Sequence, residues 1–356
     1  GDSSAIVHYL SWLGARQPNV KQTGSNFGIA LSYESPFEVE IGSGSMVSDG
    51  VTFVNLEVGS GTFRMATSRI GEDSFVGNTV VFTPQARLGN NYLIGTKTMV
   101  PIDGEVRENV GLLGSPAFEI PREVVSEKRF NPVPQTPAEH ARLAAKNAFN
   151  LRTGVLYLSS QWLLLLGLML IASAASRLDA WAIVAAAVAA PLWVVAHALI
   201  AERLSLVGFQ LRAHNCTIHE PYFWWVERHW KMSETIVKYG FTGTPFRPML
   251  LRLAGLTVGR KVFDDGSGIS EKPLTAIGDN CCINAGCSIQ GHSLEDGLYK
   301  SGRIAIGHGC TIGAAGFVHY GVQMGDNSVL AADAFLMKGA TTEAAAYWQG
   351  NPATIA

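Results

Sequence analysis

Apolar side chains in the second half of the chain recur every six residues. Between Ile277 and Ala340 they occupy positions 277, 283 and 289, and then 306, 312, 318, 324, 330 and 336. The fifth place of each hexad is usually small, as at Cys281 and Ser328. This period is typical of a hexapeptide solenoid, in which three short strands and three turns close one triangular coil. Gly, Asn or Ala often follows the aliphatic residue, and we interpret that second place as a turn that favours positive φ.

The repeat is interrupted once. From Ile289 to Ile306 the step is seventeen residues instead of six, and the surplus loop at 292–303 is polar. The loop begins with His292, which is followed by Glu295 and Asp296. A solenoid built only for stacking has no need of such a loop, so we expect it to carry the chemistry.

A second array of the same period lies earlier in the chain. Its apolar positions are 41, 47, 53, 58, 70, 76, 82, 88, 94 and 100, with Arg64 in one aliphatic slot. It has no histidine between Ile41 and Ile120, and we expect no insertion like the one at 292–303. Residues 111–135 are rich in proline and are interpreted as a linker.

Two uncharged segments separate the arrays. Residues 154–176 and 180–201 lack charged side chains. Twenty-three residues make a helix of about 34 Å, at roughly 1.5 Å per residue, and a bilayer core is about 30 Å thick. The sequence therefore predicts a mainly β protein with two left-handed parallel β-helix (hexapeptide repeat) domains, joined by a transmembrane α-helical hairpin. The expected boundaries are 1–135, 136–205 and 206–356.

Basic residues flank the outer ends of the hairpin, at Arg142, Lys146 and Arg152 on one side and at Arg203 and Arg212 on the other. The positive-inside rule places these ends, and both solenoids, in the cytoplasm of a multi-pass cell-membrane protein. The aromatic segment at 219–230 is compatible either with the headgroup level or with packing against the solenoid.

The composition narrows the class of function. The formal net charge is −2, which gives no argument for nucleic acid as a partner. The five cysteines form no paired CxxC motifs, so we interpret them as small buried side chains in a reducing compartment. No metal-site or nucleotide-binding motif is present, and we expect no directly bound cofactor. The chain begins Gly-Asp, and we expect it to be the C-terminal piece of a longer protein.

Hexapeptide solenoids often carry out acyl transfer, in which a histidine deprotonates the attacking amine or hydroxyl. His292 is the first candidate base, because it stands where the regular coil ends. Glu295 and Asp296 are candidates to orient it or to bind an amine. His319, in the second place of a hexad, is a further catalytic candidate.

Four more residues are candidates for substrate binding. Asp264, Asp265 and Glu271 precede the regular repeat and offer negative charge to a cationic substrate. Arg228, in the aromatic segment, offers positive charge to a phosphate or a thioester arm. Solvated turn residues are the simpler interpretation of the acids.

Several segments carry a more specific resemblance. They are QTGSNFG at 22–28, SDG at 48–50, IDGEVRENVGLLGSPAFEIPRE at 102–123, the segment at 258–307 and WQGNPA at 348–353. In these segments the chain resembles the C-terminal region of ε-poly-L-lysine synthetase-like, membrane-bound nonribosomal peptide synthetases. The segments cover most of the chain apart from the hairpin.

The resemblance implies amide-bond formation. An amino acid held on the phosphopantetheine arm of a carrier domain would pass to the amine of a free amino acid or a growing homo-oligomer. An adenylation domain, the carrier domain and a first tandem domain of the same synthetase would be partners, beside the lipid bilayer. The resemblance places this chain at the second and third tandem domains.

Our own hypothesis is that three tandem arrays form an intramolecular pseudo-trimer, in which the histidine-free array is a wall of the cleft, with a homodimer also possible. Two other functions stay open. One is a CoA-dependent O- or N-acyltransferase, and the other is a non-catalytic membrane scaffold or product conduit.

Overall fold

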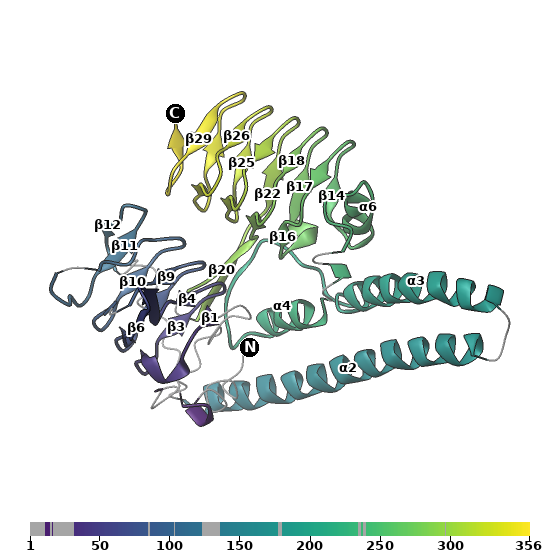
Figure 1. Ribbon diagram of the computed structural model, residues 1–356, viewed down its shortest axis with the longest axis horizontal. Coiled ribbons are helices and arrows are strands. Elements are labelled where there is room, and N and C mark those ends of the chain that lie inside the picture. The colour runs from purple at the N-terminus through teal and green to yellow at the C-terminus, as the bar shows by residue number, and fades with distance from the viewer. Residues whose placement is uncertain are drawn as a thin grey trace. The chain divides into compact units, whose positions relative to one another are not determined.

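A computed structural model describes residues 11–14, 16, 32–84, 86–102, 104–122, 136–176, 180–233, 236–237, 240–295 and 297–356. The contacts divide the chain into two compact units. Unit 1 comprises residues 1–135, 293–299 and 349–354. Unit 2 comprises residues 136–292, 300–348 and 355–356, and thus holds the long helices together with most of the second array (Figure 1).

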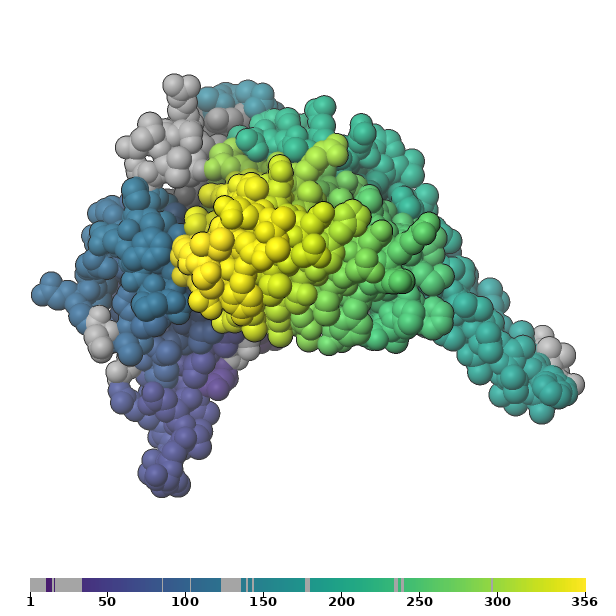
Figure 2. Space-filling view, turned by 90° about the horizontal axis from the view of Figure 1, so that it is seen from above, coloured from purple at the N-terminus to yellow at the C-terminus, as the bar shows by residue number. Residues whose placement is uncertain are grey.

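The second array is a three-sided stack of parallel strands. One face holds β14 (Thr257–Val258), β17 (Thr275–Ile277), β22 (Ile304–Ile306), β25 (Gln323–Met324) and β28 (Thr341–Thr342). The second holds β15 (Phe263–Asp264), β18 (Cys282–Ile283), β23 (Thr311–Ile312), β26 (Val329–Leu330), β29 (Tyr347–Gln349) and β30 (Thr354–Ile355). The third holds β16 (Gly268–Ile269), β19 (Ser288–Ile289), β24 (Phe317–Val318) and β27 (Phe335–Leu336). Figure 2 shows the coils following one another in chain order, from green to yellow.

The aliphatic places of the hexads point into this stack. Ile283, Ile289, Ile312, Val318 and Leu330 are all fully buried. Removing each such side chain from water contributes roughly 1.5–3 kcal/mol. The six-residue period predicted from the sequence therefore matches the inward face of a β-helix-like fold.

The first array repeats the plan with fewer coils. Its three faces are β2 (Val39–Ile41) with β7 (Ser68–Ile70), β1 (Ser32–Tyr33) with β4 (Thr52–Phe53) and β9 (Val81–Phe82), and a third sheet. The third sheet orders β3 (Met46–Val47), β8 (Phe75–Val76), β10 (Leu93–Ile94), β11 (Gly111–Leu113) and β12 (Phe118–Ile120). Strands β11 and β12 extend the array into the segment predicted as a linker. A short 3₁₀ turn, η1 (Pro36–Glu38), precedes β2.

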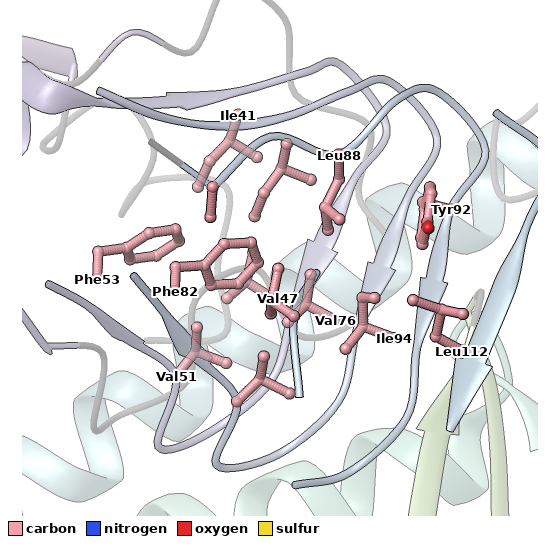
Figure 3. Close-up of a cluster of buried hydrophobic side chains, with 14 of the residues drawn as sticks. Ile41, Val47, Val51, Phe53, Val76, Phe82, Leu88, Tyr92, Ile94 and Leu112 are labelled. Carbon is pink, nitrogen blue, oxygen red and sulfur yellow. The ribbon is translucent and has the colours of Figure 1, made fainter. Parts of the chain in front are cut away.

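Two aromatic rings lie at the centre of the first array. Phe53 and Phe82 stack with ring centroids 4.8 Å apart and an interplanar angle of 22°. Aliphatic side chains of the other two faces lie in the same cluster, as Figure 3 shows for Ile41 of β2 and for Val47 and Val76 of the third sheet. The core of this unit is thus a continuous column along the stacking direction.

The first array also contains an insertion, which the sequence interpretation missed. Strands β5 (Leu56–Gly59) and β6 (Thr62–Met65) form an antiparallel hairpin outside the parallel sheets. The regular repeat stops at Phe53 and resumes at Ile70, a step of seventeen residues. The assignment of position 58 and of Arg64 to the hexad register was therefore wrong, as was the expectation of no insertion.

Positive φ angles occur at a different hexad place from the one expected. They fall at the fourth place, for example at Asn280, Ala315 and Asn327. The glycine at the second place has another cause. A Cβ on Gly313 would lie 2.4 Å from the backbone nitrogen of Ala332 in the next coil. Glycine is needed there because stacked backbones approach closely, and not because the turn is left-handed.

Within the described residues, unit 2 also contains two long helices and two shorter ones. Helix α2 (Pro137–Ala175) and helix α3 (Ala180–Leu204) lie side by side. Trp193 Nε1 donates to the carbonyl oxygen of Leu164 at 3.0 Å, and Ser160 Oγ lies 3.0 Å from His197 Nε2. Both helices are long and apolar enough to cross a membrane.

The shorter helices pack near the array. Helix α4 (Pro221–Met232) and strand β13 (Asn215–Thr217) follow α3, and α6 (Phe246–Leu253) leads into β14. Half of the side chains of α4 are buried, among them Phe223, Trp224 and Val226. Of the two expectations for the aromatic segment, the structure therefore favours core packing.

We predict that Gly313→Ala destabilises unit 2 more than Gly339→Ala does. Gly339 has a φ of +73° and nothing within 4 Å of an added Cβ, so alanine there costs about 1–2 kcal/mol of backbone strain. Gly313→Ala forces two backbones apart, and such overpacking costs about 1–3 kcal/mol or more. Chemical denaturation of the full chain measures both changes. The reverse order of stabilities would contradict the close-approach explanation.

Candidate active site

The carboxylate of Glu271 is buried where the first coil of the second array passes into the next. Glu271 is 0% exposed and immediately precedes the 3₁₀ turn η2 (Lys272–Leu274). Oε1 accepts a hydrogen bond from Trp230 Nε1 at 2.9 Å, and Oε2 accepts one from the hydroxyl of Ser270. Burial raises the pKa of this carboxyl, but the nearby His292 and the hydrogen bonds outweigh burial and leave the pKa below its ordinary value. Glu271 is therefore held as a carboxylate.

His292 is the third partner of this carboxylate. Its Nδ1 lies 2.7 Å from Glu271 Oε1, and its side chain is 16% exposed. The indole of Trp230 packs against the imidazole, with ring centroids 4.4 Å apart and an interplanar angle of 33°. Holding Nδ1 against a carboxylate fixes the ring and leaves Nε2 as the nitrogen that can take a proton from a substrate.

The stacking register brings these residues together. Gly268 and Ile269 of β16 pair with Ser288 and Ile289 of β19, an offset of twenty residues. Continuing this register places Glu271 opposite Gly291. A Cβ on Gly291 would lie 2.8 Å from Glu271 Oε2, so glycine at 291 makes room for the carboxylate.

A second buried charge network anchors the same turn. Lys272, next to Glu271 in the chain, places Nζ 2.7 Å from Oε1 of Glu202 in the last turn of α3. His229 Nε2 lies 3.7 Å from the same oxygen, and His229 Nδ1 lies 2.8 Å from Ser205 Oγ. All four side chains are almost fully buried. Removing one partner of such a pair is costly because the other charge stays buried, so α3 and α4 hold η2 in place.

His319 lies in the coil that follows. Strand β19 pairs with β24, which places His319 beside Gln290. It is 6% exposed, and its Nδ1 accepts a hydrogen bond from the backbone N–H of Tyr320 at 2.9 Å. Burial, with His292 and Lys338 nearby, lowers its pKa to about 3. His319 is therefore a neutral, buried neighbour of His292.

Glu295 of the inserted loop is placed differently from Glu271. The loop begins with β20 (His292–Glu295) and returns as β21 (Leu298–Ser301), in a sheet with the order β13, β21, β20. Successive side chains of a strand alternate between its faces, so His292 and Glu295 do not share a face. Asp296 lies outside the described residues. The carboxylate that the structure places against His292 comes instead from the preceding coil.

The other predicted binding residues lie apart from this pair. Asp264 is 1% exposed, and it accepts hydrogen bonds from the backbone N–H groups of Gly266 and Ser267 and pairs with the buried Arg247 at 3.6 Å. Its contacts thus stabilise a turn. Asp265, the next residue, is partly exposed.

Arg228 contacts helix α2. Its guanidinium lies 3.8 Å from the ring centroid of Phe149 and 4.7 Å from that of Trp225, and Nε donates to Thr153 Oγ1 at 3.0 Å. Burial and the neighbouring Arg152 lower its pKa. Its position thus ties α4 to α2.

The first array holds an apolar residue at the place equivalent to His292. Counting from the last regular position before each insertion, Phe53 corresponds to Ile289 and Leu56 corresponds to His292. The inserted strands match in length and spacing, since β5 and β6 begin at residues 56 and 62 and β20 and β21 at 292 and 298. The two arrays therefore share an insertion, and only the second carries an imidazole there.

Sequence interpretation did not identify the partners of His292. Trp230 was considered only together with Arg228, as a contact for a phosphate or a thioester arm, and Ser270 had no predicted role. Glu271 was a candidate to bind a cationic substrate, with a solvated turn residue as the simpler interpretation, and its complete burial contradicts the solvated one. The coil length offered a signal for Glu271, because residues about one coil apart stack on each other. No sequence pattern points to Trp230, which lies 41 positions before Glu271 and reaches it only through the packing of α4.

Comparison with known proteins finds a hexapeptide-repeat family and a poly-amino-acid synthetase that are similar to this chain. The family described as the hexapeptide repeat of succinyl-transferase matches residues 303–338. The chain is 26% identical over 362 residues to the delta-poly-L-ornithine synthetase of Acinetobacter baumannii, a match that covers 98% of this chain and 26% of that protein. The chain thus spans about a quarter of the length of this curated relative. The predicted resemblance to the C-terminal region of poly-amino-acid synthetases is confirmed at this level.

Solved structures of two acetyltransferases are similar over parts of the chain. A hexapeptide-repeat acetyltransferase of Vibrio cholerae is 19% identical, with a TM-score of 0.27, covering 34% of this chain and 82% of its own. A galactoside acetyltransferase, solved in complex with coenzyme A, is 22% identical, with a TM-score of 0.26, covering 31% of this chain and 68% of its own.

We predict that His319→Gln weakens the loss of stability that unit 2 shows as the pH falls. The pKa of His319 is lowered in the folded chain, so its contribution to stability is complete above the unfolded pKa of about 6.5 and is lost as the pH falls towards about 3. One such group costs at most about 1.4 kcal/mol per pH unit. Glu271 also has a lowered pKa, but its contribution is lost only below about 4.5.

Between about pH 6.5 and pH 4.5, the melting temperature of the unsubstituted chain should therefore fall more steeply than that of His319→Gln. The matched control is His308→Gln, since the side chain of His308 is 64% exposed. Parallel pH profiles for His319→Gln and the unsubstituted chain would contradict the prediction.

Proposed function

We propose that this chain is the C-terminal condensing part of a membrane-bound peptide synthetase and that His292 is its general base. The observation that carries the proposal is the 2.7 Å approach of His292 Nδ1 to the fully buried carboxylate of Glu271. A histidine fixed in this way matches the requirements of acyl transfer to an amine. The similarity to a poly-amino-acid synthetase supports the same class of reaction.

In the proposed reaction, the amine of an amino acid or a growing homo-oligomer attacks the carbonyl carbon of an aminoacyl thioester. His292 Nε2 takes the proton from the attacking nitrogen as the C–N bond forms. The C–S bond then breaks, and the thiol of the donor leaves with the proton returned by His292. Glu271 stabilises the transient imidazolium, and Trp230 and Ser270 keep that carboxylate in place.

We propose the phosphopantetheine arm of a carrier domain as the donor. An adenylation domain would load the carrier, and this chain would supply the second and third tandem domains. The monomer is then a basic amino acid of the lysine or ornithine type, in line with the name of the relative. A CoA thioester is the alternative donor.

The first array has a supporting role in this proposal. Leu56 stands at the place of His292, so the array lacks an equivalent base. We propose that it forms a wall of the condensing cleft, as one of three tandem arrays arranged as a pseudo-trimer.

Helices α2 and α3 are proposed to cross the bilayer as a hairpin with both arrays in the cytoplasm. Their length and apolarity support the crossing. Side chains that face outward include Leu158, Leu163 and Val184, each more than half exposed. Polar groups between the helices, such as Ser160 and His197, are instead bonded to each other, as expected inside a membrane.

We predict that His292→Ala lowers condensation in the full-length synthetase by about 10²–10⁴-fold, the usual contribution of a general base. Glu271→Gln should lower the rate as well, since the imidazolium then lacks its counter-charge. Carrier loading should stay unchanged in both variants, because it occurs in other domains. Product formation from a chemically loaded carrier thioester and free amino acid is the measurement.

His308→Ala is the control, as it removes an exposed histidine from a turn of the same array. Unchanged condensation in a folded His292→Ala variant would favour the scaffold function. Equal use of a CoA thioester without the carrier domain would favour a CoA-dependent acyltransferase.

A further inference from the structure

Helix α6 presents an apolar stripe to the outside of unit 2. Phe246, Met249 and Leu253 are 60%, 54% and 58% exposed. They stand three and four positions apart, which places them on one side of the helix. Phe241 continues the stripe, with its ring centroid 6.0 Å from that of Phe246 and an exposure of 42%.

The opposite side of α6 is fixed to the first coil. Arg247, Pro248, Leu250 and Leu251 are buried. The guanidinium of Arg247 donates to the carbonyl oxygens of Val237 and Ser267 at 2.7 and 3.0 Å and pairs with Asp264. The helix is therefore held rigidly, and the outward direction of the stripe is set by the fold.

The stripe lies beside the end of α3. Arg203, in the last turn of α3, donates from Nε to the carbonyl oxygen of Leu253 at 2.7 Å, and Ala198 packs with Ala254 in one buried cluster. Leu204, the last residue of α3, and Val207, three residues further on, are 62% and 63% exposed. Figure 1 shows the axis of α6 running across the direction of α3. A bilayer crossed by α3 would thus meet α6 lying along its surface.

The segment that carries the stripe has charges of one sign, and the partly exposed Asp265 follows it beside Gly243. Residues 241–263 contain Arg247, Arg252, Arg260 and Lys261 and no acid. Arg252, Arg260 and Lys261 are exposed, and Arg203 lies at the C-terminal end of the stripe. Exposed apolar residues bordered by cations are the pattern of helices that lie in the headgroup region of anionic membranes.

We infer that α6 is a membrane-surface helix that inserts Phe246, Met249 and Leu253 into the cytoplasmic leaflet beside α3. The inference rests on the proposed crossing of the bilayer by α2 and α3. The ligand is the lipid bilayer itself, with anionic headgroups near Arg252, Arg260 and Lys261. Such a contact gives unit 2 a third attachment to the membrane and fixes the orientation of its first coil there.

The experiment places a single environment-sensitive fluorophore on a new cysteine of the full chain reconstituted in lipid vesicles. The positions are Met249→Cys on the stripe, Leu163→Cys in α2 and Thr341→Cys on an exposed strand of the second array. Lipids carrying a nitroxide either near the headgroup or near the end of the acyl chain act as quenchers. The unsubstituted chain, treated with the same reagent, gives the background from the five native cysteines.

An apolar face buried about 5–10 Å into the headgroup boundary predicts strong quenching at Met249→Cys by the shallow nitroxide and weaker quenching by the deep one. Leu163→Cys should be quenched more by the deep nitroxide, and Thr341→Cys by neither. Quenching at Met249→Cys should also rise when phosphatidylglycerol replaces part of the phosphatidylcholine.

Three contradicting outcomes are distinguishable. Lack of quenching at Leu163→Cys overturns the proposed membrane crossing. Quenching at Leu163→Cys without quenching at Met249→Cys overturns the surface helix alone. Contact of the stripe with a second copy of this chain would appear as self-quenching between Met249→Cys labels that is independent of the lipid nitroxides, and it too would overturn the inference.

Discussion

The buried carboxylate of Glu271 connects a helix, the first coil and the inserted loop of the second array in unit 2. A carboxylate that is removed from water is tolerated only when donors replace its hydration, and Glu271 has Trp230, Ser270 and His292 around it. Each comes from a different place, since Trp230 lies on α4, Ser270 beside β16 and His292 on the inserted loop. Lys272 then ties the same turn to Glu202 of α3. The position of the imidazole thus depends on the packing of helices against the first coils of the array.

The two arrays share a backbone plan and differ in the side chain at one equivalent position. Both have the same triangular stack, the same fourth-place positive φ angles and an insertion that lengthens one step to seventeen residues. The backbone plan therefore does not distinguish them. A leucine at position 56 and a histidine at position 292 do, because only an imidazole exchanges protons near neutral pH. The same architecture can therefore present either an apolar side chain or an imidazole at this position.

Much of this fold was predictable because its core is periodic. Each hexad buries its own aliphatic residue against the same place in the next coil, so the pattern is visible without long-range information. Helices α2, α3 and α6 follow equally local patterns of apolarity. The hairpin at 56–65 was missed because Val58 fits the apolar pattern by coincidence, although its side chain is 76% exposed. Close backbone approach at Gly313 was likewise mistaken for a turn requirement.

The sequence by itself determined the period, the inward residues and the two long apolar helices, and it made His292 a candidate, since each depends on neighbours within a few positions. Only the tertiary structure decided which carboxylate faces His292. Glu295 and Asp296 are near it in the chain, but strand alternation turns Glu295 to the other face. Glu271 is twenty-one positions away and reaches His292 because successive coils stack. Contact across a solenoid is set by coil register and not by chain distance.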